Sequence, residues 1–408
     1  MKGIITIGLM TIAVAVQAAP HYQVLTSTKR DINTESWQLT SSEFPDYKGK
    51  ARWSINKRTL NGGKQEGVGL IEVDNGELQF RVIPTRGMSV LDVTMGDVRL
   101  GWNSPVKEVV HPSYVNLHDR GGLGWLDGFN EWMVRCGLSF AGHPGEDKFI
   151  NNVGAEATMD LTLHGKIGNI PASEVVVVVD KKAPHRIRIR GRVNEVSFYG
   201  PNLSIWTEIS TVPGSNEFRI SDELTNNGTF DEEFQIIYHA NFGRPLLGKG
   251  ARMLTASTKI VPFNDNAAKA IDKQEVYPAP TKGFTEEVYK IYPKADKAGN
   301  ATAVLVNPKG DRGVTMSWAV KQLPFLTQWK NTAAETTGYV TGIEPGTGFP
   351  HNRNYERKFG RVPKLAPGKT RSFDLGFRIL GSKSEVESAV VDVKKLQGTT
   401  GPEIQKEP

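Results

Sequence analysis

Two histidines and one glutamate lie where an apolar run of this sequence gives way to a glycine or proline turn. His239 follows three apolar residues, His164 precedes a glycine, and Glu344 precedes a proline. A strand end fixes a side chain while the following loop admits substrate. Imidazoles and partly desolvated carboxylates both exchange protons near neutral pH. The three residues therefore predict a general acid and base site, although each alone is equally explained as a hydrogen-bonded structural residue.

Five further residues are candidates for holding a substrate. Arg86 leaves a strand end at a glycine, so its guanidinium could bind hydroxyls or a carboxylate, and a surface salt bridge would explain it as well. Trp125 could stack on a sugar ring, and Lys330 ends a strand. His118 lies in a long loop, and Asn241 belongs to the turn after the histidine strand. Ordinary packing remains the alternative for these residues.

The sequence lacks the common metal-binding, nucleotide-binding and serine-hydrolase motifs. The sequence has no HxH or HExxH spacing, no G-x-G-x-x-G after a strand, no G-x-S-x-G elbow and no P-loop. The pair His118-Asp119 leaves a metal site open. We expect no cofactor and no bound metal.

Short strands are the elements that must position the site. Alternating segments such as 68–74, 77–83 and 89–95 are separated by turn residues every eight to twelve positions, with Asn75-Gly76 predicting a hairpin turn. This pattern favours an all-β fold, a large antiparallel sandwich. One helix is expected over 382–397, opening with a capping box and carrying Val386, Val390 and Val393 on one face.

Two stretches break the strand pattern. Residues 103–155 are rich in glycine, histidine and aromatic residues, and a loop of this length is expected to cover or line a site. Residues 20–66 are polar and irregular, which predicts an N-terminal arm packed across a larger body. The remaining boundaries are a β-sandwich domain over 67–398 and a tail over 399–408.

The start of the chain predicts export. Met1-Lys2, an apolar run and small residues before Ala18 and Ala19 fit a signal peptide over 1–19, so the mature chain is expected in the periplasm or outside the cell without a membrane span. Cys136 is the one cysteine of the 408 residues and is expected to be a small buried hydrophobe. The net charge of +6 is spread along the chain, which argues against nucleic acid as a partner.

Several motifs together resemble a known family. They are PTRGM (84–88), GWNSP (101–105), LHGKIGNIPA (163–172), YHANFGRP (238–245) and GIEPGTG (342–348). Their order over roughly residues 65–380 resembles the DUF4432 family of aldose 1-epimerase-like proteins, in the galactose mutarotase-like superfamily. The resemblance implies a large antiparallel β-supersandwich that binds a small carbohydrate and needs no cofactor.

The resemblance also implies roles for the candidate residues. Glu344 corresponds to the base that takes the anomeric hydroxyl proton, His239 to the acid at the ring oxygen, and His164 and Arg86 to residues that hold the sugar. Lys166 stands where the epimerase motif usually has a glycine. We therefore expect an exported aldose 1-epimerase-like enzyme acting on a sugar or sugar derivative.

Two other functions fit the same residues. A carbohydrate-binding protein without turnover would keep the aromatic and arginine contacts. A sugar lyase or hydrolase is the other alternative, and a hydrolase needs a second carboxylate beside Glu344, for which Asp119, Asp127 and Glu131 are the candidates. The sequence leaves the oligomeric state open.

Overall fold

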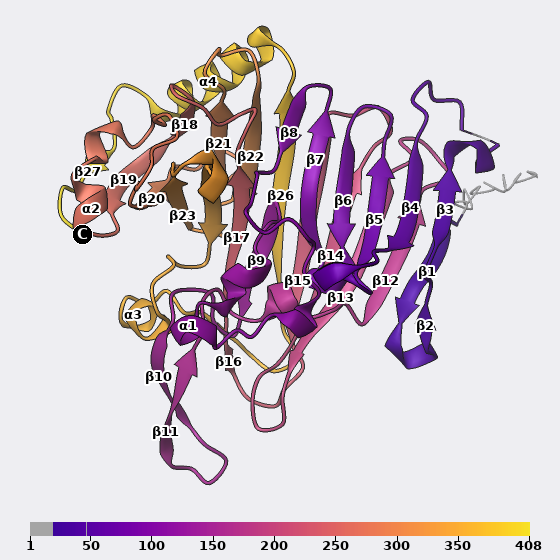
Figure 1. Ribbon diagram of the computed structural model, residues 1–408, viewed down its shortest axis with the longest axis horizontal. Helices are drawn as coiled ribbons and strands as arrows, with labels where there is room; N and C mark the ends of the chain where they lie inside the picture. The colour runs from indigo at the N-terminus through magenta and orange to yellow at the C-terminus, as the bar shows by residue number, and fades with distance from the viewer. Residues whose placement is uncertain (1–18, 46) are drawn as a thin grey trace, which may run out of the picture.

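The computed structural model describes residues 19–45 and 47–408, and in this range two large sheets pack face to face (Figure 1). This confirms the predicted all-β sandwich. The signal peptide expected over 1–19 lies almost entirely outside the described residues. Within the described part of the chain, no helix is long and apolar enough to span a membrane.

The first sheet has ten strands. In spatial order they are β18 (Arg252–Thr255), β21 (Asn300–Val306), β22 (Gly313–Ala319), β26 (Thr370–Leu380), β15 (Glu217–Asn226), β14 (Asn202–Thr211), β13 (Ile187–Val196), β12 (Glu174–Val179), β1 (His21–Ser27) and β2 (Ile32–Asn33). All neighbours in this sheet pair antiparallel.

The second sheet has thirteen strands and carries the residues of interest. In spatial order they are β27 (Glu403–Ile404), β19 (Ser257–Pro262), β20 (Glu287–Pro293), β23 (Phe325–Asn331), β24 (Val340–Gly346), β17 (Gln235–Phe242), β9 (Met133–Leu138), β7 (Ser89–Met95), β6 (Gln79–Ile83), β5 (Gly69–Asp74), β4 (Ser54–Thr59) and β3 (Trp37–Thr40), with β8 (Val98–Leu100) beside β7. The pairing of β19 with β27 is parallel.

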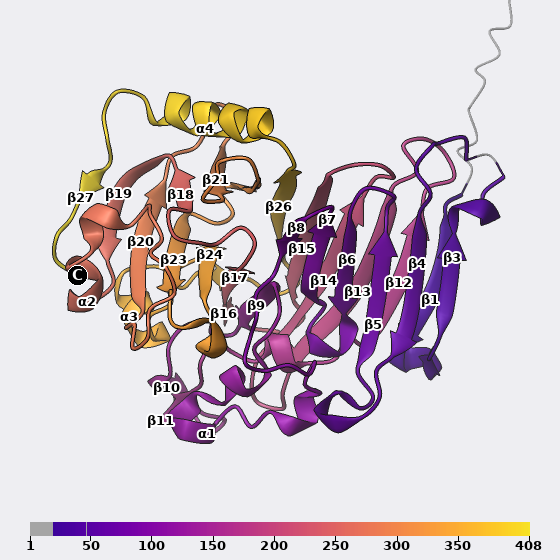
Figure 2. The ribbon, with the colours of Figure 1, turned by 45° about the horizontal axis from the view of Figure 1, so that its top comes forward.

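The remaining elements lie outside the two large sheets. β10 (Gly145–Ile150) and β11 (Glu156–Leu161) form a hairpin, and β16 (Glu232–Glu233) pairs with β25 (Lys364–Leu365) from a distant part of the chain. The helices are α1 (Asp119–Gly122), α2 (Asp265–Ala268), α3 (Arg353–Lys358) and α4 (Lys383–Gln397). The hairpin β10–β11 projects from one side of the sandwich, and α4 lies across the opposite side (Figures 1 and 2).

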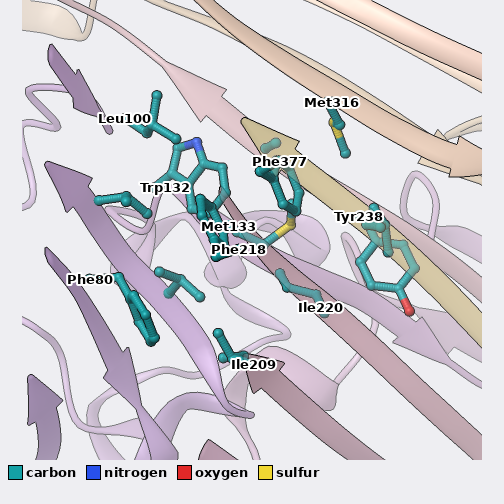
Figure 3. Packing of buried hydrophobic residues seen from close by; sticks show 14 of the residues in the cluster. Phe80, Leu100, Trp132, Met133, Ile209, Phe218, Ile220, Tyr238, Met316 and Phe377 are labelled. Carbon is teal, nitrogen blue, oxygen red and sulfur yellow. The ribbon is translucent and has the colours of Figure 1, made fainter. Parts of the chain in front are cut away.

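The core lies between the two sheets and is rich in aromatic rings (Figure 3). Phe218 of the first sheet stacks on Phe377 at 4.9 Å, and Trp132 meets both with its edge. A fully buried ion pair joins Arg135 on β9 to Asp222 on β15, and the Tyr238 hydroxyl donates to the same carboxylate at 2.7 Å. Apolar packing and one satisfied charged pair therefore fix the two sheets against each other.

The predicted C-terminal helix is confirmed as α4. Its N-cap Ser382 accepts a hydrogen bond from the Glu385 backbone N–H, and the buried face contains Val386 and Val393. These valines pack on β18, β21 and β26, on the outer face of the ten-stranded sheet. Such a short helix is stable because its apolar face is covered by the sheet.

The N-terminal segment differs from the prediction. The residues expected as an irregular arm form β1 and β2 at the edge of one sheet and β3 and β4 at the edge of the other. Leu25, Trp53 and Ile55 are at most 2% exposed and belong to the core. The expectation was wrong because the strands are short and their apolar positions are separated by polar loops.

The long loop also differs in part. Its first section, 103–132, has no strand and contains short helical turns. Residues 133–138 form β9 in the middle of the thirteen-stranded sheet, and residues 145–150 form β10. Every residue of β9 is buried. A strand buried on both faces shows no polar alternation, which is why the sequence pattern missed it.

Candidate active site

His239 and Glu344 lie opposite each other on two neighbouring strands. The register that pairs Ala240 with Ile343 and Asn241 with Gly342 brings His239 on β17 across from Glu344 on β24. Tyr238 and Ile343 point into the core, so the alternation of side chains turns His239 and Glu344 to the outer face of the sheet. His239 Nε2 is 3.2 Å from Glu344 Oε1.

Glycine at position 342 makes room for the carboxylate. A Cβ atom there would lie 2.1 Å from Glu344 Oε1, so the carboxylate folds back over a position where no side chain fits. The neighbouring glycine therefore sets the position of the glutamate side chain within the GIEPGTG segment.

His164 reaches the same place from the loop after β11. Its backbone is left-handed, with φ 60°, and its ring centroid is 5.2 Å from that of His239. His164 Nδ1 is 3.0 Å from the Ala141 carbonyl oxygen. Because a carbonyl oxygen can only accept, Nδ1 carries the proton and Nε2 is left as an acceptor.

Aromatic rings cover the three polar groups. The Trp125 ring centroid is 4.7 Å from His164 and 6.0 Å from His239, and Phe129 and Trp329 lie 5.4 and 5.5 Å from His239. His239 is 4% exposed, Glu344 2% and His164 8%. Charged forms of these groups are therefore poorly solvated.

Burial dominates the electrostatics of the site. It raises the pKa of Glu344 well above its usual range, and the nearby carboxylate of Glu286 acts in the same direction. Burial and repulsion from His164 lower the pKa of His239 well below its usual range. Burial also lowers the pKa of His164 to about 4. The shifts of Glu344 and His239 both favour the uncharged forms, a protonated carboxyl group and a neutral imidazole.

Several buried polar atoms around this pair have no hydrogen-bond partner within the described residues. They are His239 Nδ1, Glu344 Oε1, Asn241 Oδ1, Trp125 Nε1 and Thr327 Oγ1. The contact of 3.2 Å between His239 and Glu344 is thus close but not aligned as a hydrogen bond. Each such group costs about 1–3 kcal/mol. A concentration of them at one place is typical of a site that a polar ligand completes.

Arg86 holds the segment 103–132, which covers the site, and its side chain does not face the reacting pair. Its guanidinium is fully buried, pairs with Glu131 at 2.8 Å and donates to the carbonyl oxygens of Val110 and Gly128. A Cβ at Gly128 would lie 2.1 Å from the guanidinium, which explains that glycine. Arg86 therefore fastens the 103–132 segment to the sheet, in place of the sugar contact that its sequence context suggested.

Asn241 joins the same segment to the histidine strand. Its amide nitrogen donates to the backbone carbonyls of Glu131 and His239, both at 3.1 Å, and its oxygen is left unpartnered beside His239. Of the predicted substrate-binding residues, Asn241 and Trp125 are thus brought next to the reacting groups.

Two predicted substrate-binding residues lie elsewhere. Lys330 points to the core side of β23, pairs with Glu287 at 3.4 Å and donates to three carbonyl oxygens, the nearest being Val276 O at 3.0 Å. Its neighbour Trp329 faces the site instead, because adjacent residues of a strand point to opposite faces. His118 is exposed on the covering segment. Neither Lys330 nor His118 contacts the reacting pair of His239 and Glu344.

Two residues of the site were not identified from the sequence. Phe129 covers His239, and Thr327 pairs with Glu344 across β23 and β24. Glu131, a candidate for the second carboxylate of a hydrolase, holds Arg86 instead. Only the register of the sheet brings Thr327 there, and no sequence pattern encodes it. Cys136 is buried with a pKa raised by burial, which fits its predicted role as a small hydrophobe. Among the described residues, no three His, Cys, Asp or Glu side chains cluster as metal ligands would.

Comparisons with known proteins agree with this architecture. A candidate aldose 1-epimerase from Klebsiella pneumoniae subsp. pneumoniae has 42% identity and a TM-score of 0.89, over 95% of this chain and 98% of that one. A galactose mutarotase-like protein from Clostridium acetobutylicum has 14% identity and a TM-score of 0.54, over 80% and 98%. The galactose 1-epimerase from Lactobacillus acidophilus has 13% identity and a TM-score of 0.50, over 80% and 98%.

The two distant structures establish only the fold, which is galactose mutarotase-like. No functionally curated protein matches this chain. The family model described as "Domain of unknown function (DUF4432)" matches residues 65–379, which contain His164, His239 and Glu344. The chain therefore belongs to the DUF4432 family.

Proposed function

We propose that this protein is an aldose 1-epimerase-like enzyme that interconverts the α and β anomers of a sugar or sugar derivative. The observation that carries the proposal is the contact of 3.2 Å between His239 and Glu344, at a buried place where neighbouring polar atoms have no partner among the described residues. Anomer interconversion needs one group that removes a proton and another that delivers one, held on the same sugar.

The reaction requires one mobile proton. Transfer from Glu344 to His239 gives a carboxylate and an imidazolium. The carboxylate removes the proton of the anomeric hydroxyl as the C1–O5 bond breaks and the C1 carbonyl forms, and the imidazolium protonates the departing ring oxygen O5. After rotation about C1–C2, closure on the other face of the carbonyl reverses both transfers. Protons and bonds balance without a cofactor.

Neighbouring residues would orient the sugar. The free Nε2 of His164 accepts from a sugar hydroxyl, and the unpartnered Trp125 Nε1 donates to one. The half-buried Trp329 offers a ring face for stacking. Because the reacting pair is almost fully covered, a pyranose enters only after Trp125 or Phe129 moves outward.

None of the three carboxylates considered as the partner of Glu344 in a hydrolase is available beside it. Glu131 is bound by Arg86, Asp127 pairs with Arg120 at the surface, and Asp119 is exposed. A binding protein without turnover remains the competing function. It would keep sugar affinity when either reacting group is replaced.

Saturation-transfer NMR of anomer exchange tests the proposal, with a panel of neutral aldoses and uronic acids. The wild-type protein should exchange the anomers of at least one sugar faster than the sugar does without protein. Glu344→Gln and His239→Asn should each lower kcat by roughly 10²–10⁴. Asp127→Asn, the same type of substitution on the surface of the cover, should leave kcat unchanged. Sugar-dependent thermal stabilisation without accelerated exchange would support a binding protein instead.

We further propose that the protein works outside the cytoplasm, which rests on the signal peptide expected over 1–19. Expression of the full chain in a bacterium should give a mature protein in the periplasmic fraction whose first residue, by N-terminal sequencing, is Ala19 or Pro20. An intact Met1 in the cytoplasmic fraction would contradict this.

A further inference from the structure

A largely buried lysine lies on the site face of the thirteen-stranded sheet. Lys290 of β20 is 7% exposed, and among the described residues no hydrogen bond or ion pair holds its ammonium group. Its Nζ lies 6.0 Å from the centre of the Phe263 ring. The ammonium nitrogen is not one of the fully buried unpartnered atoms, so the side chain is covered while its charged end reaches solvent, where a ligand can meet it.

The other buried lysines among the described residues are held by the protein itself. Lys330, on the next strand, binds Glu287 and three carbonyl oxygens. Lys57 donates to the side chain of Asn33 and to the Thr34 carbonyl. Lys290 differs from both, because no described side chain or carbonyl oxygen binds its ammonium group.

Lys290 belongs to the same row of side chains as the reacting pair. β20 pairs Lys290 with Thr327, and β23 pairs Thr327 with Glu344, which lies opposite His239. Partners in register point to the same face, and Lys290 is two strand spacings from Glu344, roughly 10 Å between backbones. The Thr327 hydroxyl between them is buried and unpartnered. Figure 2 shows β20, β23 and β24 side by side.

Two histidines complete the surroundings of Lys290. His351 stacks on Phe263 at 4.0 Å and His143 at 5.5 Å, so the two imidazoles and the ammonium group share one aromatic wall. His351 Nε2 is buried and has no partner within the described residues. Burial, with repulsion from Lys290, lowers the pKa of His351 to about 3. His351 is therefore neutral and keeps one ring N–H that can donate to a ligand.

Two acidic residues lie near this cluster, and neither forms a hydrogen bond or an ion pair with Lys290. Glu356 is taken up by Arg361 through two hydrogen bonds of 2.6 and 2.7 Å. Glu286 is exposed and accepts from Trp329 Nε1 at 2.8 Å. Burial lowers the pKa of His143, and the charge of Glu286 opposes this shift.

We propose that Lys290, His143 and His351 form an anion subsite that holds a negatively charged substituent, a carboxylate or a phosphate, at the end of the sugar remote from the anomeric carbon. This inference rests on the proposed function and narrows its substrate class to acidic sugars. The anion supplies the missing partner of Lys290, and the two imidazoles donate to its oxygens. The row from Lys290 to His239 then spans the sugar from its charged substituent to its anomeric carbon.

The test is a comparison of acidic and neutral sugars by saturation-transfer NMR. The wild type should exchange the anomers of glucuronate, galacturonate or glucose 6-phosphate with a kcat/KM at least 10-fold above that of glucose and galactose. A higher kcat/KM for the two uronates identifies the anion as a carboxylate, and a higher value for glucose 6-phosphate identifies it as a phosphate. Lys290→Met should lower this ratio at least 10-fold. The exposed Lys269, changed to Met as the matched control, should leave the ratio unchanged. An equal or higher kcat/KM for neutral sugars in the wild type would overturn the subsite.

Direct binding separates this proposal from the proposed reaction. Titration calorimetry compares glucuronate and glucose 6-phosphate with glucose for the wild type, Lys290→Met and the milder Lys290→Gln, in case the first variant does not fold. Tighter binding of the anion that is lost with Lys290, without accelerated exchange of any sugar, keeps the subsite and refutes the epimerase. Exchange of neutral sugars, with equal binding of acidic and neutral sugars, keeps the epimerase and refutes the subsite.

Discussion

His164 combines a left-handed backbone, a buried ring and one hydrogen bond to a carbonyl oxygen. Its pKa falls from an unfolded value of about 6.5 to about 4 in the folded protein. Between these two values the unfolded chain binds more protons than the folded one. The contribution of His164 to stability is therefore complete above pH 6.5 and is lost as the pH falls towards 4.

Replacing His164 by Asn should flatten this acid response, because Asn tolerates the left-handed backbone and does not titrate. We expect the loss in free energy of unfolding between pH 7 and pH 4.5 to shrink by roughly 2–3 kcal/mol, measured by urea denaturation. His185→Asn is the matched control, since its φ is 57° and its Nδ1 also meets a carbonyl oxygen, at 3.2 Å, but its ring is half-buried. The same acid response in wild type and His164→Asn would contradict the assignment.

The segment 103–132 acts as an element because a buried ion pair fastens it. Arg86 and Glu131 are both fully buried, and the segment carries Trp125 and Phe129 over the reacting pair. A buried ion pair adds little to the free energy of unfolding compared with apolar residues of the same size. Replacing one partner, however, leaves the other charge buried and uncompensated. The pair therefore determines the position of the cover more than the overall stability.

A double-mutant cycle measures this role. Arg86→Met and Glu131→Gln should each lower the free energy of unfolding by roughly 3–5 kcal/mol, and the double variant by clearly less than the sum. The exposed pair Arg120 and Asp127 lies on the same segment, and Arg120→Met should cost less than about 1 kcal/mol. Additive losses in urea denaturation would mean that Arg86 and Glu131 do not act as a pair.

The sequence identified the reacting residues but placed them wrongly at strand ends. His239 lies inside β17 and Glu344 inside β24, because both strands continue through residues whose types are typical of turns. Lys330 was misplaced because only the register of β23 decides which of two adjacent residues faces the site. The turn at Asn75 was predicted as a two-residue turn but is a four-residue loop. Its side chain donates to Thr211, Val212 and Ser215, contacts that no local pattern contains.

At the scale of the whole molecule, one segment closes both sheets at the same end. β1 pairs with β12 in the ten-stranded sheet, and β4 pairs with β5 in the thirteen-stranded sheet (Figure 1). Because an unpaired strand edge invites association with another chain, these N-terminal strands protect two edges at once. The domain therefore begins before residue 65, where the match to the family model starts.

Deletion of residues 20–59 from the mature chain tests this integration. The deletion uncovers the edges of β12 and β5 and removes Leu25, Trp53 and Ile55 from the core, so we expect aggregation in size-exclusion chromatography and no cooperative unfolding transition. Deletion of 403–408, which removes only the exposed strand β27, should leave Tm within a few degrees of the wild type. A monomeric 20–59 deletion with an unchanged Tm would instead identify the segment as the detachable arm that its polar sequence suggests.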